Sequence, residues 1–312
     1  MPARSKSKRR AKRLKRKKKE SRRFGLSRRL GFLALIFAAV YLFVSLSTKF
    51  WKQDKKLAIV VVGDSSVTVG VFDPVSEKIT SFAIPADLQV NAARQYGVWR
   101  IGALRNLGKD EGVGTKLVSE SILFHLNLPV FIWAEQEAEG FLGDSIWGVL
   151  KASLYPYDTN LGVGDKLKLG FFALSTKRFK KEEIDFSRLA NFKRQTLKDG
   201  EEGFVLTKDL PASITSHFSD NYFSSQRIAI QIVNKSGRLE ASEVLAGVVE
   251  VLGAKAAAIV NEEAEDFDCL VTTDDKMVSE TLADIFSCKG VEGATGSFDA
   301  RLEVGTEFAD RL

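Results

Sequence analysis

Histidine, cysteine and proline are scarce in this chain of 312 residues. Its two histidines, His125 and His217, lie far apart, which argues against a histidine-rich metal site and against a Ser-His-Asp triad. Two cysteines are too few for a disulfide-dense scaffold or a four-cysteine zinc site. The content of 45% hydrophobic and 28% charged residues is that of a globular protein. The length suits about two domains of roughly 100–200 residues each.

The positive charge is confined to the start of the chain. Residues 1–29 hold 16 Lys and Arg against one acid, Glu20, for a net charge of +15. The remainder holds 30 bases and 39 acids, for a net charge of −9. We expect residues 1–29 to form a basic cytoplasmic tail that is attracted to anionic lipid. The acidic remainder shows no footprint for nucleic acid, so we do not expect nucleic acid as a partner.

Residues 30–47 form an uncharged run of 18 residues. As a helix, this run would be about 27 Å long, close to the hydrocarbon thickness of a bilayer. The excess of basic residues before it predicts a cytoplasmic N-terminus. We therefore expect a transmembrane helix at residues 30–48 and a single-pass protein of the plasma membrane, with its bulk outside the cytoplasm. A cleaved signal peptide is the alternative.

After the apolar run, strand-like and helix-like segments alternate, which indicates an α/β fold. Strands are predicted at residues 57–62, 67–72, 78–84 and 128–134. Helices are predicted at 116–126 and 141–150, a strand-like segment at 162–175, and an amphipathic segment at 186–197. A polar connector at 209–225 precedes a second unit at 226–312. There the order of the predicted elements is βαββαβ, with strands at 228–233, 256–260, 269–272 and 300–304 and helices at 239–252 and 276–286.

Short motifs of the first unit follow a familiar order. They are Phe72-Asp73-Pro74, Lys78-Ile79-Thr80, Ile84-Pro85-Ala86-Asp87, Arg100-Ile101, Leu128-Pro129-Val130, Gly140-Phe141, Arg178-Phe179-Lys180 and Asp185-Phe186-Ser187-Arg188. In this order they resemble the LytR-CpsA-Psr (LCP) domain. Residues 226–312 are similar to the LytR C-terminal domain that often follows it. The resemblance implies an LCP-like α/β/α domain with a mixed sheet at residues 57–208.

The LCP resemblance also implies a function. The family transfers glycopolymer from a polyprenyl pyrophosphate lipid onto peptidoglycan, using Mg²⁺. A pyrophosphate calls for arginine forks and a divalent ion. By the resemblance, Asp87 is the candidate catalytic residue, and Asp64 and Asp87 are the candidate Mg²⁺ ligands. The candidate pyrophosphate-binding residues are Arg100, Arg178, Lys180, Arg188 and Arg194. The alternative for the two acids is a role in turns, and for the five basic residues a solvated surface.

The sequence departs from the family at several of these positions. Gly63, Ser65 and Ala86 stand where the family has Arg, Asp and Arg, and Lys180 replaces an arginine of an Arg-x-Arg pair. Lysine keeps the charge but loses the bidentate fork. We therefore expect a degenerate relative without catalysis and with no cofactor, Mg²⁺ being required only if activity survives. Residues 102–110 do not match a phosphate-binding P-loop, because five residues separate the glycines and Asp110 follows Gly-Lys.

Cys269 and Cys288 lie in the second unit. Outside the cytoplasm they can form a disulfide; the alternative is a buried thiol in a strand and another at a helix end. Three functions remain open. The first is an envelope protein that binds or scaffolds wall glycopolymer, a polyprenyl-phosphate lipid, peptidoglycan or an envelope protein. The second is an active LCP phosphotransferase. The third is a membrane-tethered adaptor that acts through its basic tail.

Overall fold

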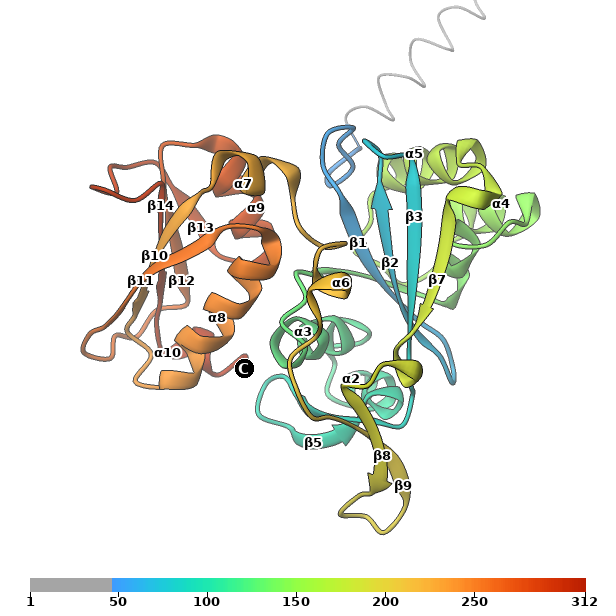
Figure 1. Cartoon of the computed structure of the whole chain (residues 1–312), viewed down its shortest axis with the longest axis horizontal. Coiled ribbons are helices and arrows are strands. Elements are labelled where there is room, and N and C mark those ends of the chain that lie inside the picture. The colour runs from blue at the N-terminus through green and yellow to red at the C-terminus, as the bar shows by residue number, and fades with distance from the viewer. Residues whose placement is uncertain (1–46) are drawn as a thin grey trace, which may run out of the picture.

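The computed structural model describes residues 47–312, which form two halves that lie side by side (Figure 1). We call residues 47–210 the N-terminal half and residues 226–312 the C-terminal half. The predicted tail at 1–29 and nearly all of the predicted transmembrane helix at 30–48 lie outside the described residues. Within residues 47–312, no helix is both long enough and apolar enough to cross a membrane.

A five-stranded mixed sheet in the order β6-β1-β2-β3-β7 forms the centre of the N-terminal half. Strands β1, β2 and β3 are antiparallel to one another. The edge strand β6 pairs in parallel with β1, and the edge strand β7 pairs in parallel with β3. The predicted strands at 57–62, 67–72 and 78–84 are confirmed. The bounds are β1 Leu57–Val62, β2 Val67–Asp73, β3 Lys78–Ile84, β6 Ile132–Glu135 and β7 Lys181–Asp185.

Helices cover both faces of this sheet, which gives three layers. Alternate residues of β1 point to opposite faces, as in any strand. Val60 and Val62 pack with α2 (Leu104–Asp110) and α3 (Lys116–His125). Ile59 and Val61 pack with α4 (Ile146–Leu154) and α5 (Val163–Ser175). Both faces of β1 are buried, and this explains its unbroken apolar sequence.

Several segments of the N-terminal half differ from the sequence prediction. Residues 162–175, predicted as strand-like, form helix α5, because Asp165, Leu169 and Ala173 recur at helical spacing and are buried. The amphipathic segment at 186–197 divides into the short 3₁₀ turn η4 (Phe186–Arg188) and strand β8 (Phe192–Thr196). The predicted helix at 141–150 begins later, as α4, where the side chain of Ser145 accepts the Gly148 N–H and caps it.

A second, four-stranded sheet extends one end of this half in the order β5-β4-β9-β8. Its strands are β4 Leu88–Ala92, β5 Gly97–Arg100, β8 Phe192–Thr196 and β9 Glu202–Leu206. The connector that follows is not an extended tether, since it contains α6 (Ala212–Thr215) and α7 (Asn221–Gln226). Ile214 and Phe218 of this connector are buried in the core of the N-terminal half.

The C-terminal half contains a five-stranded sheet in the order β11-β10-β14-β12-β13. The predicted order βαββαβ is wrong by one strand, because β13 (Lys289–Val291) follows the second helix. All three residues of β13 are exposed, so no apolar pattern marks the strand. The remaining bounds are β10 Ala229–Asn234, α8 Leu239–Leu252, β11 Lys255–Asn261, β12 Cys269–Thr272, α9 Lys276–Phe286, β14 Ala300–Val304 and α10 Thr306–Ala309.

The two halves are in direct contact. Leu123 of α3 belongs to the hydrophobic core of the C-terminal half, and α3 packs against α8. Near the start of the described chain, the Lys52 ammonium lies 2.6 Å from the Glu280 carboxylate of α9. A cavity of about 70 Å³ lies between the halves beside this ion pair. That volume has room for only a few water molecules.

Candidate functional site

Several sequence-predicted residues follow strand ends at one edge of the first sheet. Val62, the last residue of β1, pairs with Glu135 at the end of β6, and β3 ends on the same side, since Val67 pairs with both Val62 and Ile84. Asp64, Asp87 and Arg188 come directly after the strands β1, β3 and β7 in the chain. Strand ends at one edge of an α/β sheet are a common place for binding sites. The topology therefore brings these residues to one edge.

Arg105 of α2 is the centre of an ion-pair cluster at this edge. Its guanidinium donates to Asp64 Oδ1 at 2.5 Å and to Glu135 Oε1 at 2.9 Å. The ammonium of Lys109, one turn further along α2, lies 4.0 Å from Glu135. The Arg105 side chain is 16% exposed, whereas that of Asp64 is 86% exposed. The Asp64 carboxylate is thus already paired with the Arg105 guanidinium.

Burial alone would raise the pKa of Glu135. The hydrogen bonds from Arg105 and from the Asp158 backbone, with the charges of Arg105 and Lys109, outweigh it, so the pKa of Glu135 lies below its ordinary value. The hydrogen bond to Glu135 also raises the pKa of Arg105, and it does so more than the hydrogen bond to Asp64. Since the folded pKa of Glu135 is depressed, this carboxylate stabilises the fold above its unfolded pKa of about 4.3. The contribution is lost as the pH falls through the folded value.

We expect Arg105→Ala to lower the free energy of unfolding by about 1–3 kcal/mol at pH 7, because it removes the guanidinium bonded to the half-buried Glu135 and leaves Lys109, 4.0 Å away, as its cation. Urea unfolding at several pH values measures this, and the difference from wild type should shrink as the pH falls below about 4. Arg188→Ala is the matched control, since that side chain is 85% exposed and its loss should change stability by less than about 0.5 kcal/mol. Equal effects of the two substitutions would contradict a structural role for the cluster.

Asp87, Arg100 and Arg194 meet at the second sheet rather than around a pocket. The backbone carbonyl of Asp87 accepts the Phe204 N–H, and Arg194 pairs with Phe204 across β8 and β9. Arg100 donates to Asp199 at 3.0 Å, and Arg194 lies 3.0 Å from Glu202. Within residues 47–312, the Asp87 carboxylate has no hydrogen bond or ion pair.

The other three basic candidates also pair with acids. Arg178 contacts Asp144 at 2.9 Å with its side chain 89% exposed. Lys180 lies 2.6 Å from Glu77 of the β2–β3 turn. Arg188 lies 3.4 Å from Asp185, three residues earlier. The pair with Lys180 and the hydrogen bond it donates lower the pKa of Glu77.

Taken together, the five basic candidates do not form one anion pocket. Arg100 and Arg194 face the β8–β9 loop, Arg178 and Lys180 lie at the 3₁₀ turn η3 (Arg178–Lys180), and Arg188 lies in η4. Each has a carboxylate partner that a bound pyrophosphate would have to displace. Arg178 and Arg188 are solvated, whereas the side chains of Arg100 and Lys180 are partly buried in their ion pairs.

The predicted Mg²⁺ site does not fit the residues present. Asp64 and Asp87 follow different strands, and Asp64 is held by Arg105, whose positive charge opposes a cation. Among residues 47–312, no group of three or more His, Cys, Asp or Glu side chains is arranged to hold a metal ion. Mg²⁺ requires near-octahedral oxygen ligands, of which proteins commonly supply one or two carboxylates. We therefore derive no metal-dependent step.

The layer between the first sheet and α4 and α5 is filled by side chains. Phe72, Phe141 and Trp51 are almost completely buried there. The rings of Trp51 and Phe172 lie 5.1 Å apart. Aromatic packing of this kind contributes to the core on this side of the sheet.

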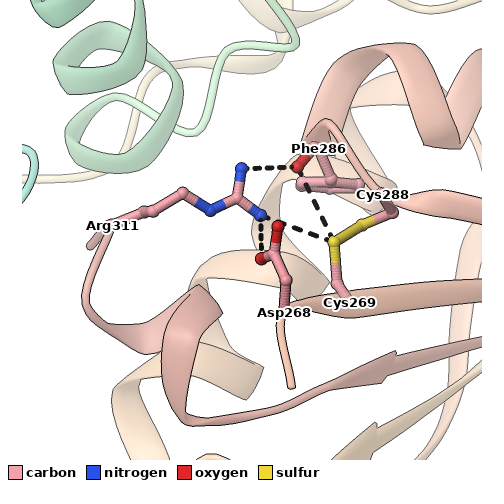
Figure 2. Close-up of a disulfide and its surroundings, with 5 residues drawn as sticks. All are labelled: Asp268, Cys269, Phe286, Cys288 and Arg311. Atoms are coloured by element: carbon pink, nitrogen blue, oxygen red, sulfur yellow. Dashed lines mark hydrogen bonds and ion pairs between the residues drawn. A yellow bond between two sulfur atoms is a disulfide. The ribbon is translucent and has the colours of Figure 1, made fainter.

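Cys269 and Cys288 form a disulfide in the C-terminal half, with their Cα atoms 4.9 Å apart (Figure 2). It joins β12 to the segment after α9. Arg311 lies beside it, donating to Asp268 at 2.6 Å and to the Phe286 carbonyl at 3.0 Å (Figure 2). The bridge and this arginine tie the end of the chain to the sheet.

Sequence reasoning missed three features. Arg105 lies within residues 102–110, where no sequence motif points to it. The buried Asp165, three residues after Gly162, was hidden by the strand prediction for 162–175. The same error hid an exposed apolar stripe on α5, although the spacing of Val163, Phe171 and Leu174 is helical.

No protein-family model matches the sequence, and no curated protein matches it. Several solved structures are similar. B. subtilis TagT has 15% identity, with 51% of this chain and 87% of that chain covered and a TM-score of 0.37. B. subtilis TagV has 12% identity, with 66% of this chain and 100% of that chain covered and a TM-score of 0.39. The LytR-CPS2A-psr family protein YwtF (TagT) with bound octaprenyl pyrophosphate lipid has 14% identity, with 66% and 94% covered and a TM-score of 0.37.

Proposed function

We propose that the protein is a membrane-anchored, extracytoplasmic component of the cell envelope, with a degenerate LCP-like domain followed by a LytR C-terminal domain. Its role is to bind or scaffold a wall component, such as a glycopolymer, a polyprenyl-phosphate lipid, peptidoglycan or an envelope protein. The LCP resemblance of residues 57–200 and the uncharged run at 30–47 support this location. The disulfide between Cys269 and Cys288 also supports it, because such bonds persist in oxidising compartments.

One observation carries the non-catalytic part of the proposal. All five basic candidates are paired with carboxylates, over separate parts of the N-terminal half. Phosphoryl transfer depends on positioned cations that neutralise charge in the transition state. A surface whose cations are already neutralised, and whose candidate metal ligand Asp64 is bound to Arg105, lacks that arrangement.

The test is a turnover assay with the full-length chain purified in detergent. An octaprenyl pyrophosphate lipid serves as the probe, with Mg²⁺ and a peptidoglycan acceptor. We expect no transfer and no release of phosphate above the background without protein. Turnover that disappears in Asp87→Ala but persists in Asp110→Ala would overturn the proposal and establish the transferase instead.

A bound lipid is measured in the same preparation. Mass spectrometry of the organic extract reports whether a polyprenyl phosphate co-purifies. A lipid present without turnover fits the binding role, while its absence directs the search to glycopolymer and protein partners.

A further inference from the structure

Large apolar side chains project outward from α4 and α5. Trp147 is 81% exposed and Phe171 is 80% exposed. We use the name apolar ridge for the exposed side chains Ile146, Trp147, Leu150, Leu154, Phe171 and Leu174. Scattered apolar residues are normal on a protein surface, but a set concentrated on two packed helices marks an interaction surface.

The spacing makes the ridge a second apolar face of each helix. On α4 the ridge residues follow at intervals of one, three and four, so they share one side. The opposite side of α4 is already buried through Val149 and Ala152. On α5, Leu169 and Ala173 point to the core while Phe171 and Leu174 point away. The core therefore accounts for one face of each helix and leaves the ridge without a partner in the described chain.

The described chain begins beside these helices. The backbone N–H groups of Phe50 and Trp51 both donate to the Asp165 carboxylate of α5 at 2.8 Å. A Cβ atom added at Gly162 would collide with the Ser47 carbonyl. Figure 1 shows α4 and α5 at the end of the molecule where the described chain starts. The uncharged run at residues 30–47 thus leads directly to the start of α5.

Cations accompany the ridge. The Lys177 ammonium lies 5.8 Å from the centre of the Phe179 ring. The Lys151 ammonium lies 5.8 Å from that of Tyr155 and, on its other side, 3.8 Å from the Glu137 carboxylate at an exposed position. Lys168, which has no ion-pair partner within residues 47–312, lines an open hollow with Phe171. Lysines beside exposed aromatic and aliphatic side chains are typical of helices that lie in a membrane interface.

We propose that the apolar ridge lies in the interfacial region of the lipid bilayer, beside the anchor that the sequence predicts, with its lysines at anionic headgroups. This goes beyond the proposed function and rests on it only for the anchor. The predicted anchor precedes residues that pack beside α5, and such a tether keeps the ridge at a high local concentration of lipid. A second copy of the chain is the less favoured occupant, because it would bring a similar set of lysines against these.

The test places a fluorophore on the ridge. Both native cysteines are in the disulfide, so Trp147→Cys or Phe171→Cys provides a single free thiol for labelling. Val98→Cys is the matched control: it is 49% exposed, and β5 lies at the other end of the N-terminal half (Figure 1). The labelled full-length proteins are reconstituted into vesicles of phosphatidylcholine and phosphatidylglycerol, with or without brominated acyl chains.

We expect brominated lipid to quench the labels at 147 and 171 at least about threefold more strongly than the label at 98, because interfacial helices sink to the level of the acyl boundary. Equal quenching at all three positions would overturn the proposal. So would weak lipid quenching combined with energy transfer between labels that grows with protein density, since that result indicates a second copy. The comparison does not depend on catalysis or on which side of the membrane the domain lies, so its failure is distinct from failure of the proposed function.

Discussion

Asp165→Ala should lower the free energy of unfolding by about 3 kcal/mol or more, because it leaves several buried backbone donors without an acceptor. The Asp165 carboxylate is completely buried and accepts the backbone N–H groups of Lys49, Phe50, Trp51 and Gly162. It holds the first described residues of the chain against the start of α5. An unsatisfied buried donor costs about 1–3 kcal/mol, and the substitution removes the acceptor of several donors at once.

Thermal unfolding measures this effect. For a protein of this size, about 3 kcal/mol corresponds to a decrease of roughly 5 °C in Tm. Asp165→Asn, which keeps the volume and one acceptor oxygen, should lose less than Asp165→Ala. Asp110→Ala on the exposed surface of α2 is the matched control and should stay within about 0.5 kcal/mol of wild type. Limited trypsin digestion should also cleave the alanine variant faster at Lys49 and Lys52. A Tm equal to that of the control would show that the start of the chain is held by other contacts.

Removing the disulfide with the double substitution Cys269→Ala and Cys288→Ala should lower the free energy of unfolding by about 3 kcal/mol. The two cysteines are 19 residues apart, and closing a loop of this length restricts the unfolded chain by about that amount. Cys269 is also buried in the core of the C-terminal half, so replacing it by alanine removes packing contacts there as well.

Urea unfolding with and without reductant separates the bridge from the side chains. Reductant should destabilise the wild type and leave the double variant unchanged. If reductant has no effect on the wild type in unfolding experiments, the cysteines are not bridged in the protein. Mass measurement after alkylation of the native protein provides the independent count of free thiols.

Three strands of the first sheet, β1, β2 and β3, were predictable because their residues repeat a simple rule. Residues 57–62, 67–73 and 78–84 are rich in Val, Ile and Phe, and turn residues separate them. Helix α8 was predictable for a similar reason, since its apolar face is regular and Gly253 ends it with a φ of 98°. In these segments local propensity and burial favour the same structure.

The segment at 162–175 was mispredicted because its outer face is apolar as well. A helix with apolar residues on both sides loses the amphipathic signal, so its apolar residues do not distinguish a helix from a strand. Strand β13 was missed for the opposite reason: its three exposed residues contain no apolar pattern, and pairing with β12 alone defines it. The secondary structure of α5 and β13 therefore depends on tertiary contacts and not on local sequence pattern.

The sequence by itself determined the α/β class of the fold, the excess of basic charge before residue 30 and the uncharged run that follows it. These are properties of composition and local periodicity, which the order of residues carries directly. The sequence also identified charged candidate residues, but it could not predict which of them lie in contact with one another.

Only the tertiary structure decided that Arg100, Arg178, Lys180, Arg188 and Arg194 each lie beside a carboxylate and do not converge. Their partners are supplied by other elements, as with Asp199 for Arg100 and Glu77 for Lys180. The same holds for Arg105, whose partners Asp64 and Glu135 come from two different strand ends. Electrostatic partnership depends on distances of a few ångströms between segments far apart in the chain, and such distances exist only once the sheet has formed.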